Sequence, residues 1–244
     1  MALPGEQDEL IRRVAAANPK TTVVLNAGSP VAMPWADEVP AILQAWYPGQ
    51  EGAAGLADVL LGSADPGGRL PTTFARRVED HPSHVTYPGE AGKVSYGEGV
   101  FVGYRAFERL GREPLFAFGH GLSYTSFELG PPTLDSAAIR AGDSILVTIP
   151  VTNAGSRPGS TVVQVYVRDV KSALMRPEKE LKGFAKVHLA AGETRVAAVE
   201  LGPRAFEAWD PRTHGWVAEP GEFEVLAGQS SAAISGSATL ELTL

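Results

Sequence analysis

The hydrophobic residues follow two different spacings along the chain, and the spacing changes near residue 125. In the first part, Gln7 to Ala17 places its apolar residues on one face and its charges opposite, which predicts a short amphipathic helix. Thr21 to Leu25 is β-branched and almost wholly apolar, the pattern of a buried parallel strand. Two further helices are predicted at Trp35 to Ala45 and at Ala53 to Leu61. Helix, strand and helix in this order are typical of an α/β domain.

In the second part, apolar and polar residues alternate in short runs that are separated by turn residues. Alternation of this kind predicts strands with one buried face. Their regular spacing is typical of an antiparallel β-sandwich. We predict strands at Ser144 to Val151, Thr161 to Arg168, Leu181 to Leu189, Thr194 to Leu201, Gly221 to Ala227 and Ala238 to Leu244.

These patterns divide the chain into three segments. Residues 1–70 are predicted to form a partial α/β sandwich domain, because only one convincing buried strand falls within them. Residues 71–127, rich in glycine, proline and aromatic residues, are predicted to form an ordered connector that packs on this domain. Residues 128–244 are predicted to form the β-sandwich, and Gly130-Pro131-Pro132 interrupts the pattern at the boundary.

Composition narrows the classes of function. Hydrophobic residues make up 44% of the chain and charged residues 20%, which is enough to bury a core. The net charge of −7 argues against binding to nucleic acid or to an anionic membrane. No run approaches the ~20 apolar residues of a membrane-spanning helix. The chain has no cysteine, which excludes disulfides and thiolate metal sites, and it shows no cofactor-binding loop, so we expect no cofactor.

The first residues, Met1 to Glu6, contain no basic region and no apolar region of the kind that a secretory signal needs. We therefore expect no signal peptide here, and a cytoplasmic location if the chain is made as it stands.

Seven runs of the sequence, in this order, resemble the C-terminal part of glycoside hydrolase family 3 β-glucosidases. Each run alone is a weak signal, but together they cover nearly the whole chain. The runs are VLNAGSP at 24–30, WYPGQEG at 46–52, DPGGRLP at 65–71, YGEGVFVGYR at 96–105, PLFAFGHGLSY at 114–124, VTNAG at 151–155 and PEKELKGF at 177–184.

The resemblance implies an incomplete α/β sandwich domain followed by a fibronectin type III-like domain. It also implies a larger plan, in which a (β/α)8-type barrel precedes these domains and carries an Asp nucleophile, while a loop of the α/β sandwich supplies a Glu as general acid/base. Such retaining enzymes hold the two carboxyl groups ~5–5.5 Å apart across the sugar.

Neither catalytic position is expected in this chain. The nucleophile belongs to the barrel, and the acid/base belongs to a segment just before the stretch that matches Leu3 to Leu10. We therefore expect the chain to lack glycosidase activity alone, and to act as a structural half or as the half that lines the substrate seam.

Three residues are candidates for chemistry if the chain is active by itself. Glu51 follows an aromatic pair in a glycine-flanked loop, which suits a sugar-facing group, but a carboxylate at the start of a helix is the favoured interpretation. Glu98 lies between two glycines, where an exposed catalytic group and an ion pair with Arg105 or another base are alternatives, the second favoured. His120 has no partner at metal-ligand spacing, and a histidine hydrogen-bonded at the domain junction is favoured.

Four aromatic residues of the last segment have two interpretations. Trp209, Trp216, Phe206 and Phe223 could form a platform for stacking sugars, or they could be core and corner residues of the sandwich. The second interpretation is favoured, because large aromatic residues dominate such cores.

Three hypotheses for function follow. The first is the C-terminal half of a β-glucosidase-like enzyme whose parent cleaves terminal β-linked sugars with retention. The second is an interaction module, or a weak binder of β-linked saccharides, that self-associates or pairs with a separate barrel. The third is a small hydrolase with a repurposed site.

Overall fold

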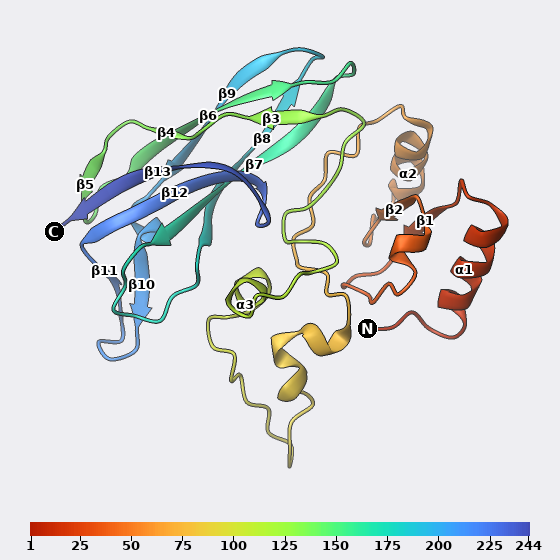
Figure 1. Cartoon of the computed structure of the whole chain (residues 1–244), viewed down its shortest axis with the longest axis horizontal. Coiled ribbons are helices and arrows are strands. Elements are labelled where there is room, and N and C mark those ends of the chain that lie inside the picture. Colours follow the sequence, from red (N-terminus) through yellow and green to blue (C-terminus); the bar gives the residue numbers. More distant parts are fainter.

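The computed structural model describes residues 1–244 and shows a mixed α/β part joined to a β-sandwich (Figure 1). The first part, with the segment that follows it, contains two parallel strands and several short helices. These are α1 (Gln7–Ala17), β1 (Thr22–Leu25), η1 (Ala36–Glu38), β2 (Ala41–Gln44), α2 (Gly52–Leu61), η2 (Val78–Asp80), η3 (Pro82–Val85) and α3 (Tyr104–Arg109).

The second part contains eleven strands and one short helical turn. They are β3 (Phe127–Leu129), β4 (Thr133–Leu134), β5 (Ala138–Arg140), β6 (Ile145–Asn153), β7 (Gly159–Asp169), β8 (Glu180–Leu189), β9 (Thr194–Leu201), η4 (Pro203–Ala205), β10 (Glu207–Asp210), β11 (Gly215–Ala218), β12 (Gly221–Ser230) and β13 (Ala233–Thr243).

The α/β part has a small core of its own. Strands β1 and β2 are parallel, with Thr22 opposite Ala41. The Trp35 side chain is fully buried and donates its indole N–H to the Asp8 carboxylate on α1 at 2.7 Å, which attaches that helix to the sheet. The buried cluster around it consists of Val23, Leu25, Val31, Met33, Trp35 and Phe74.

The predicted helix from Trp35 to Ala45 is wrong. A single 3-10 turn, η1, ends before Val39, which is extended, and the chain then forms β2. Pro40 explains the difference, because proline lacks the N–H that a helix needs and forces the preceding residue into an extended conformation. The α/β part therefore has a second strand that the sequence did not predict, although β1 remains the only one of the two with buried residues.

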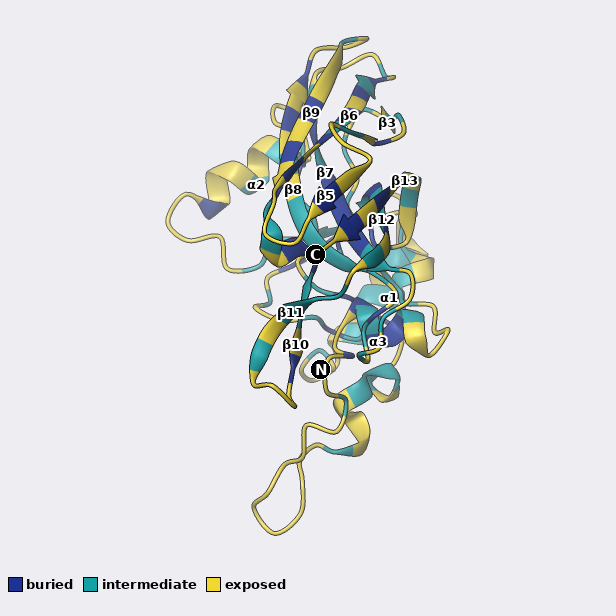
Figure 2. Cartoon of the chain, turned by 90° about the vertical axis from the view of Figure 1, so that its left-hand side faces the viewer, coloured by how far each residue is buried: buried dark blue, intermediate teal, exposed yellow.

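The middle of the chain, residues 71–126, contains no extended sheet. An isolated bridge between Phe74 and Phe116 holds its two ends together. Between them, the chain from Tyr87 to Gly97 forms a long exposed loop, at the bottom of the view in Figure 2. The domain boundaries at residues 70 and 127 stay a prediction.

The β-sandwich packs two sheets face to face. One sheet has the order β5-β13-β12-β7-β8, and in the other β6 pairs with β3, β4 and β9. The core between them contains 21 buried residues, among them Ile149, Val165 and Phe223. All six predicted strands are present, and β6 alternates between buried and more exposed positions as its sequence predicts.

Strand β7 departs from simple alternation, because both of its faces are covered. Val163, Val165 and Val167 point into the sandwich core, as predicted. On the other face, Gln164 and Tyr166 are also buried. The segment before the sandwich covers this face.

None of the helices in the structure is long and apolar enough to cross a membrane.

Candidate functional site

The loops after β1 and β2 meet at one edge of the α/β part, because the carboxyl ends of parallel strands lie on the same side. The Gln44 side chain donates a hydrogen bond to the Ala27 carbonyl at 2.9 Å and joins the two loops. Tyr47 lies directly on Gly28, where an added Cβ would collide with the tyrosine ring. The phenol itself is 78% exposed, so this edge presents an aromatic side chain to its surroundings.

Glu51 lies at the same edge, at the N-cap position of α2. Its side chain is exposed and makes no capping hydrogen bond. A negative charge at a helix N-terminus is favourable, so this placement agrees with the structural interpretation. It also leaves the carboxylate free to meet a ligand at this edge.

Glu98 lies in a turn of the exposed loop, and its expected ion pair with Arg105 is absent. Arg105 instead contacts Glu180, at 3.5 Å. One carboxylate oxygen of Glu98 is buried without a hydrogen-bond partner. The glycine-rich sequence around Glu98 therefore does not place a base beside it.

His120 belongs to a row of aromatic rings that crosses the middle of the molecule. Its imidazole stacks on Phe116 with ring centres 5.4 Å apart, and Phe116 contacts Phe74, which contacts Trp46. Burial lowers the pKa of His120, and the positive charge of Arg69 lowers it further. The structure gives its ring no hydrogen bond, so the expected junction histidine is held by stacking instead. No contact joins Glu51, Glu98 and His120.

Asp65, to which no role was assigned from the sequence, joins three distant segments. Its carboxylate accepts hydrogen bonds from the Ser123 hydroxyl, from the Tyr124 N–H at 3.0 Å and from the Ser160 N–H at 2.9 Å. Burial alone would raise the pKa of Asp65, but these hydrogen bonds outweigh it and hold the pKa below its ordinary value. A side chain at Gly67 would collide with Ser160, so the glycine permits this close approach.

A second polar cluster joins α3 to the start of β8. Glu180 lies 2.8 Å from Arg176 and 3.5 Å from both Arg105 and Lys182. Nearby, Glu108 of α3 pairs with Lys179, and burial raises the pKa of this glutamate. The two clusters hold the sandwich to the α/β part at separate points.

The signal for these clusters was present in the sequence. Asp65 and Glu180 lie within two of the runs that carry the family resemblance, DPGGRLP and PEKELKGF. Their roles could not be inferred, because their partners lie up to 95 positions away along the chain.

Asp65→Ala should lower the free energy of unfolding at pH 7 by about 2–4 kcal/mol, since it removes a charged acceptor and leaves two backbone N–H groups unpaired. A carboxyl whose folded-state pKa is lowered stabilises the protein above its unfolded pKa of about 3.9, and this stabilisation is lost as the pH falls through the folded-state value. Urea denaturation at pH 7, 5 and 3.5 should therefore show the difference from the parent shrinking only at the lowest pH.

The matched control is Asp37→Ala, because this carboxylate is 88% exposed and lies 3.7 Å from Arg76. It should change stability by less than about 1 kcal/mol. Equal effects of the two substitutions would contradict the role of Asp65.

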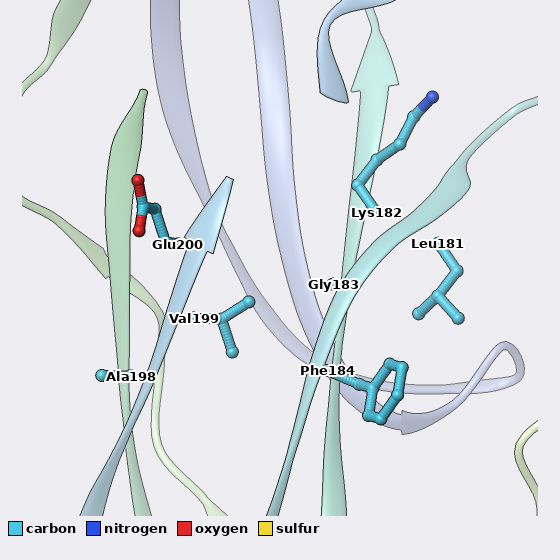
Figure 3. Close-up of a pocket in the computed structure, with 7 residues that line it drawn as sticks. All are labelled: Leu181, Lys182, Gly183, Phe184, Ala198, Val199 and Glu200. Atoms are coloured by element: carbon cyan, nitrogen blue, oxygen red, sulfur yellow. The ribbon is translucent and has the colours of Figure 1, made fainter. Parts of the chain in front are cut away.

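Two of the cavities in the structure lack a pair of carboxylates. One, of about 460 Å³, opens between β8 and β9, where Figure 3 shows Glu200 and Lys182 extending away from each other. The other, of about 250 Å³, lies between α3 and the β12–β13 turn, and its one carboxylate is Glu108. No group of three metal-ligating side chains is present.

The four aromatic residues of the sandwich divide into two pairs. Phe206 and Phe223 are buried in the core, as the favoured interpretation requires. Trp209 and Trp216 are each 48% exposed and face each other across the β10–β11 hairpin, so they are not core residues.

Comparison with known proteins gives concordant results. Residues 1–124 match the glycosyl hydrolase family 3 C-terminal domain, and residues 161–231 match a fibronectin type III-like domain. A thermostable β-glucosidase B from Acetivibrio thermocellus is 46% identical over 231 residues, which are 95% of this chain and 31% of the relative. A β-glucosidase from Rhizobium radiobacter is 45% identical over 247 residues, which are 99% of this chain and 30% of the relative.

Solved structures agree with this result. A β-glucosidase from Streptomyces venezuelae, in complex with D-glucose, superimposes with a TM-score of 0.93 and 42% identity over 98% of this chain. A β-glucosidase from Kluyveromyces marxianus, in complex with glucose, superimposes with a TM-score of 0.94 and 39% identity over the whole of this chain. The chain spans only 31% and 29% of these two structures. It therefore belongs to glycosyl hydrolase family 3, and it corresponds to the C-terminal domain of the β-glucosidases of that family with the fibronectin type III-like domain that follows.

Proposed function

We propose that residues 1–244 are a C-terminal fragment of a retaining β-glucosidase-like enzyme, and that they have no glycosidase activity alone. One observation carries the proposal. The chain matches its relatives over almost its entire length but spans about 30% of theirs, and neither of the two cavities described above offers the carboxylate pair that retention requires.

In the complete enzyme, a barrel would supply the nucleophile, which attacks the anomeric carbon while a general acid protonates the departing oxygen. Water then hydrolyses the glycosyl-enzyme intermediate. This chain would contribute by positioning the sugar and not by supplying a catalytic group. The β1–β2 edge, with exposed Tyr47 and Glu51, would border the sugar at the seam.

The sandwich would have a structural role and hold the α/β part in a fixed orientation. Asp65 and Glu180 attach it to the α/β part through charged hydrogen bonds and ion pairs from separate segments. Two such attachments restrict rotation between the parts, which would hold the seam-facing loops in place against a barrel.

The proposal predicts that the purified 244-residue chain hydrolyses aryl β-glucosides no faster than buffer does. Losing one member of a catalytic carboxylate pair already removes most of such activity. Glu51→Gln and Glu98→Gln variants should be indistinguishable from the parent. Turnover that survives repeated purification and falls in either variant would overturn the proposal, because the carboxylates of this half would then act without a barrel.

A second function, as an interaction module, is favoured by the exposed apolar residues of α1. No residue of this helix is buried, and Leu10 and Val14 are 60% and 44% exposed. Apolar surface of this kind suits a partner, either a barrel or a second copy of the chain. Sedimentation that depends on concentration would favour the second copy over the barrel.

A further inference from the structure

The β10–β11 hairpin carries two tryptophans that the core does not use. Trp209 and Trp216 are directly opposite each other in the antiparallel register. Their ring centres are 5.7 Å apart with an angle of 69° between the planes. Figure 1 shows the hairpin below the sandwich, at the opposite end of the molecule from α1.

This exposure needs a physical reason. Tryptophan is highly buried on average, and these two are each 48% exposed, whereas Phe206 and Phe223 nearby are buried. A cross-strand aromatic pair stabilises a hairpin, but that role needs contact between the rings and does not need their outer surfaces to stay in water. The two indoles meet edge to face and form an exposed apolar corner at the surface.

Charged hydrogen-bonding groups border this corner. The Arg204 guanidinium lies 3.7 Å from the centre of the Trp216 ring and covers one of its faces. The same guanidinium pairs with Glu207 at 2.9 Å, and the arginine side chain is 60% exposed. A donor and an acceptor therefore lie beside an apolar surface. Because the guanidinium already covers one face of Trp216, the Trp209 indole is the ring without such a cover.

We propose that Trp209 and Trp216 form a binding site for β-linked gluco-oligosaccharides, with Trp209 as the stacking surface. A β-linked glucose unit presents an apolar C–H face and a rim of hydroxyl groups. The C–H face would lie on the indole, while the hydroxyls would reach Arg204 and Glu207. The choice of β-linked glucose rests on the proposed function, whereas the site itself rests on the hairpin geometry.

The four tryptophans of the chain make a direct test possible, because each indole N–H gives one signal in a nitrogen–proton NMR spectrum. Titration of the labelled 244-residue chain with cellotriose should move the signals of Trp209 and Trp216. The Trp35 signal should stay in place, since its indole is buried and bonded to Asp8. Trp209→Ala should weaken binding about tenfold or more, the scale found where an aromatic stacking surface is removed.

Two further variants separate binding from folding. Trp209→Phe keeps an aromatic pair in the hairpin and should still weaken cellotriose binding several-fold, with the Trp216 signal in its folded position. Phe184→Ala removes another exposed aromatic side chain of the sandwich, 68% exposed, and should leave the affinity unchanged.

Movement of the Trp46 signal alone would place the sugar at the β1–β2 edge and overturn this site while leaving the proposed function intact. Unmoved signals throughout the titration, or equal affinity of the parent and both Trp209 variants, would also overturn it. Equal binding of sucrose would contradict the assigned class of ligand.

Discussion

Arg176→Ala should lower the free energy of unfolding by about 3–5 kcal/mol, the scale for removing one partner of a buried ion pair. The Arg176 side chain is only 6% exposed. It lies 3.3 Å from Asp169, at the end of β7, and 2.8 Å from Glu180, at the start of β8. It also donates a hydrogen bond to the Phe206 carbonyl at 3.4 Å.

The size of the effect follows from what the substitution leaves behind. Burial already raises the pKa of Asp169. The burial of Glu180 acts in the same direction, but Arg176 and its other cationic neighbours hold that pKa below its ordinary value. Without the guanidinium, two poorly solvated carboxylates would remain near each other, so both pKa values would rise and the β7–β8 loop would loosen.

Arg195→Ala is the matched control, because this arginine is 55% exposed and pairs with Glu193 at 2.6 Å. Its loss should cost less than about 1 kcal/mol. Arg176→Lys keeps the positive charge but loses the planar guanidinium that can donate to two acceptors at once. Its loss in free energy of unfolding should lie between those of Arg176→Ala and Arg195→Ala. Guanidinium denaturation of all three variants checks the order. If Arg176→Ala were no more damaging than Arg195→Ala, the cluster would not stabilise the fold.

Phe223→Ala should lower the free energy of unfolding by about 3–5 kcal/mol, because it removes a large side chain from a closed core and leaves a cavity. Phe223 is fully buried on β12 and packs edge-to-face on Phe206 with ring centres 5.6 Å apart. This contact ties the five-stranded sheet to the turn η4 that precedes the β10–β11 hairpin. The surrounding residues, Val225 and Leu240 among them, come from regular strands that cannot shift easily to fill the space.

The same denaturation experiment on Phe184→Ala supplies the comparison. Phe184 is 68% exposed, so its truncation should change stability by about 0.5 kcal/mol or less. A loss for Phe223→Ala as small as this would mean that the two sheets do not form one cooperative core. A large loss that also abolished the hairpin signals of Trp209 and Trp216 would show that the hairpin depends on this core.

Arg176 and Phe223 both support the attachment of the sandwich to the α/β part. The Arg176 cluster reaches α3 through Glu180 and Arg105, and the Phe223 core supports the strands on which that cluster is built. Damage to either should therefore weaken the attachment of the sandwich to the α/β part, in addition to weakening the sandwich itself.

Local spacing along the sequence determined much of the fold. Alternation with a period of two identified the six long strands of the sandwich, because each of them buries one face against the opposite sheet. The ordered series of seven runs was enough to identify the family, which the comparisons confirm. These signals work because they depend on neighbouring residues or on fixed order.

The tertiary structure decided what depends on distant partners. The second face of β7 is buried because Tyr104 and Gly119 come from the preceding segment to contact Tyr166 and Gln164. Nothing in the local pattern of β7 encodes that cover.

The candidate residues show the same limit. Glu51 and Glu98 look alike as carboxylates flanked by glycine, yet one lies exposed at a helix start and the other keeps an oxygen buried in a turn. Arg105 contacts Glu180, not Glu98, because α3 faces the sandwich. Sequence alone therefore determined the elements and the family, whereas partner choice and burial were decided by contacts between segments that only the folded chain brings together.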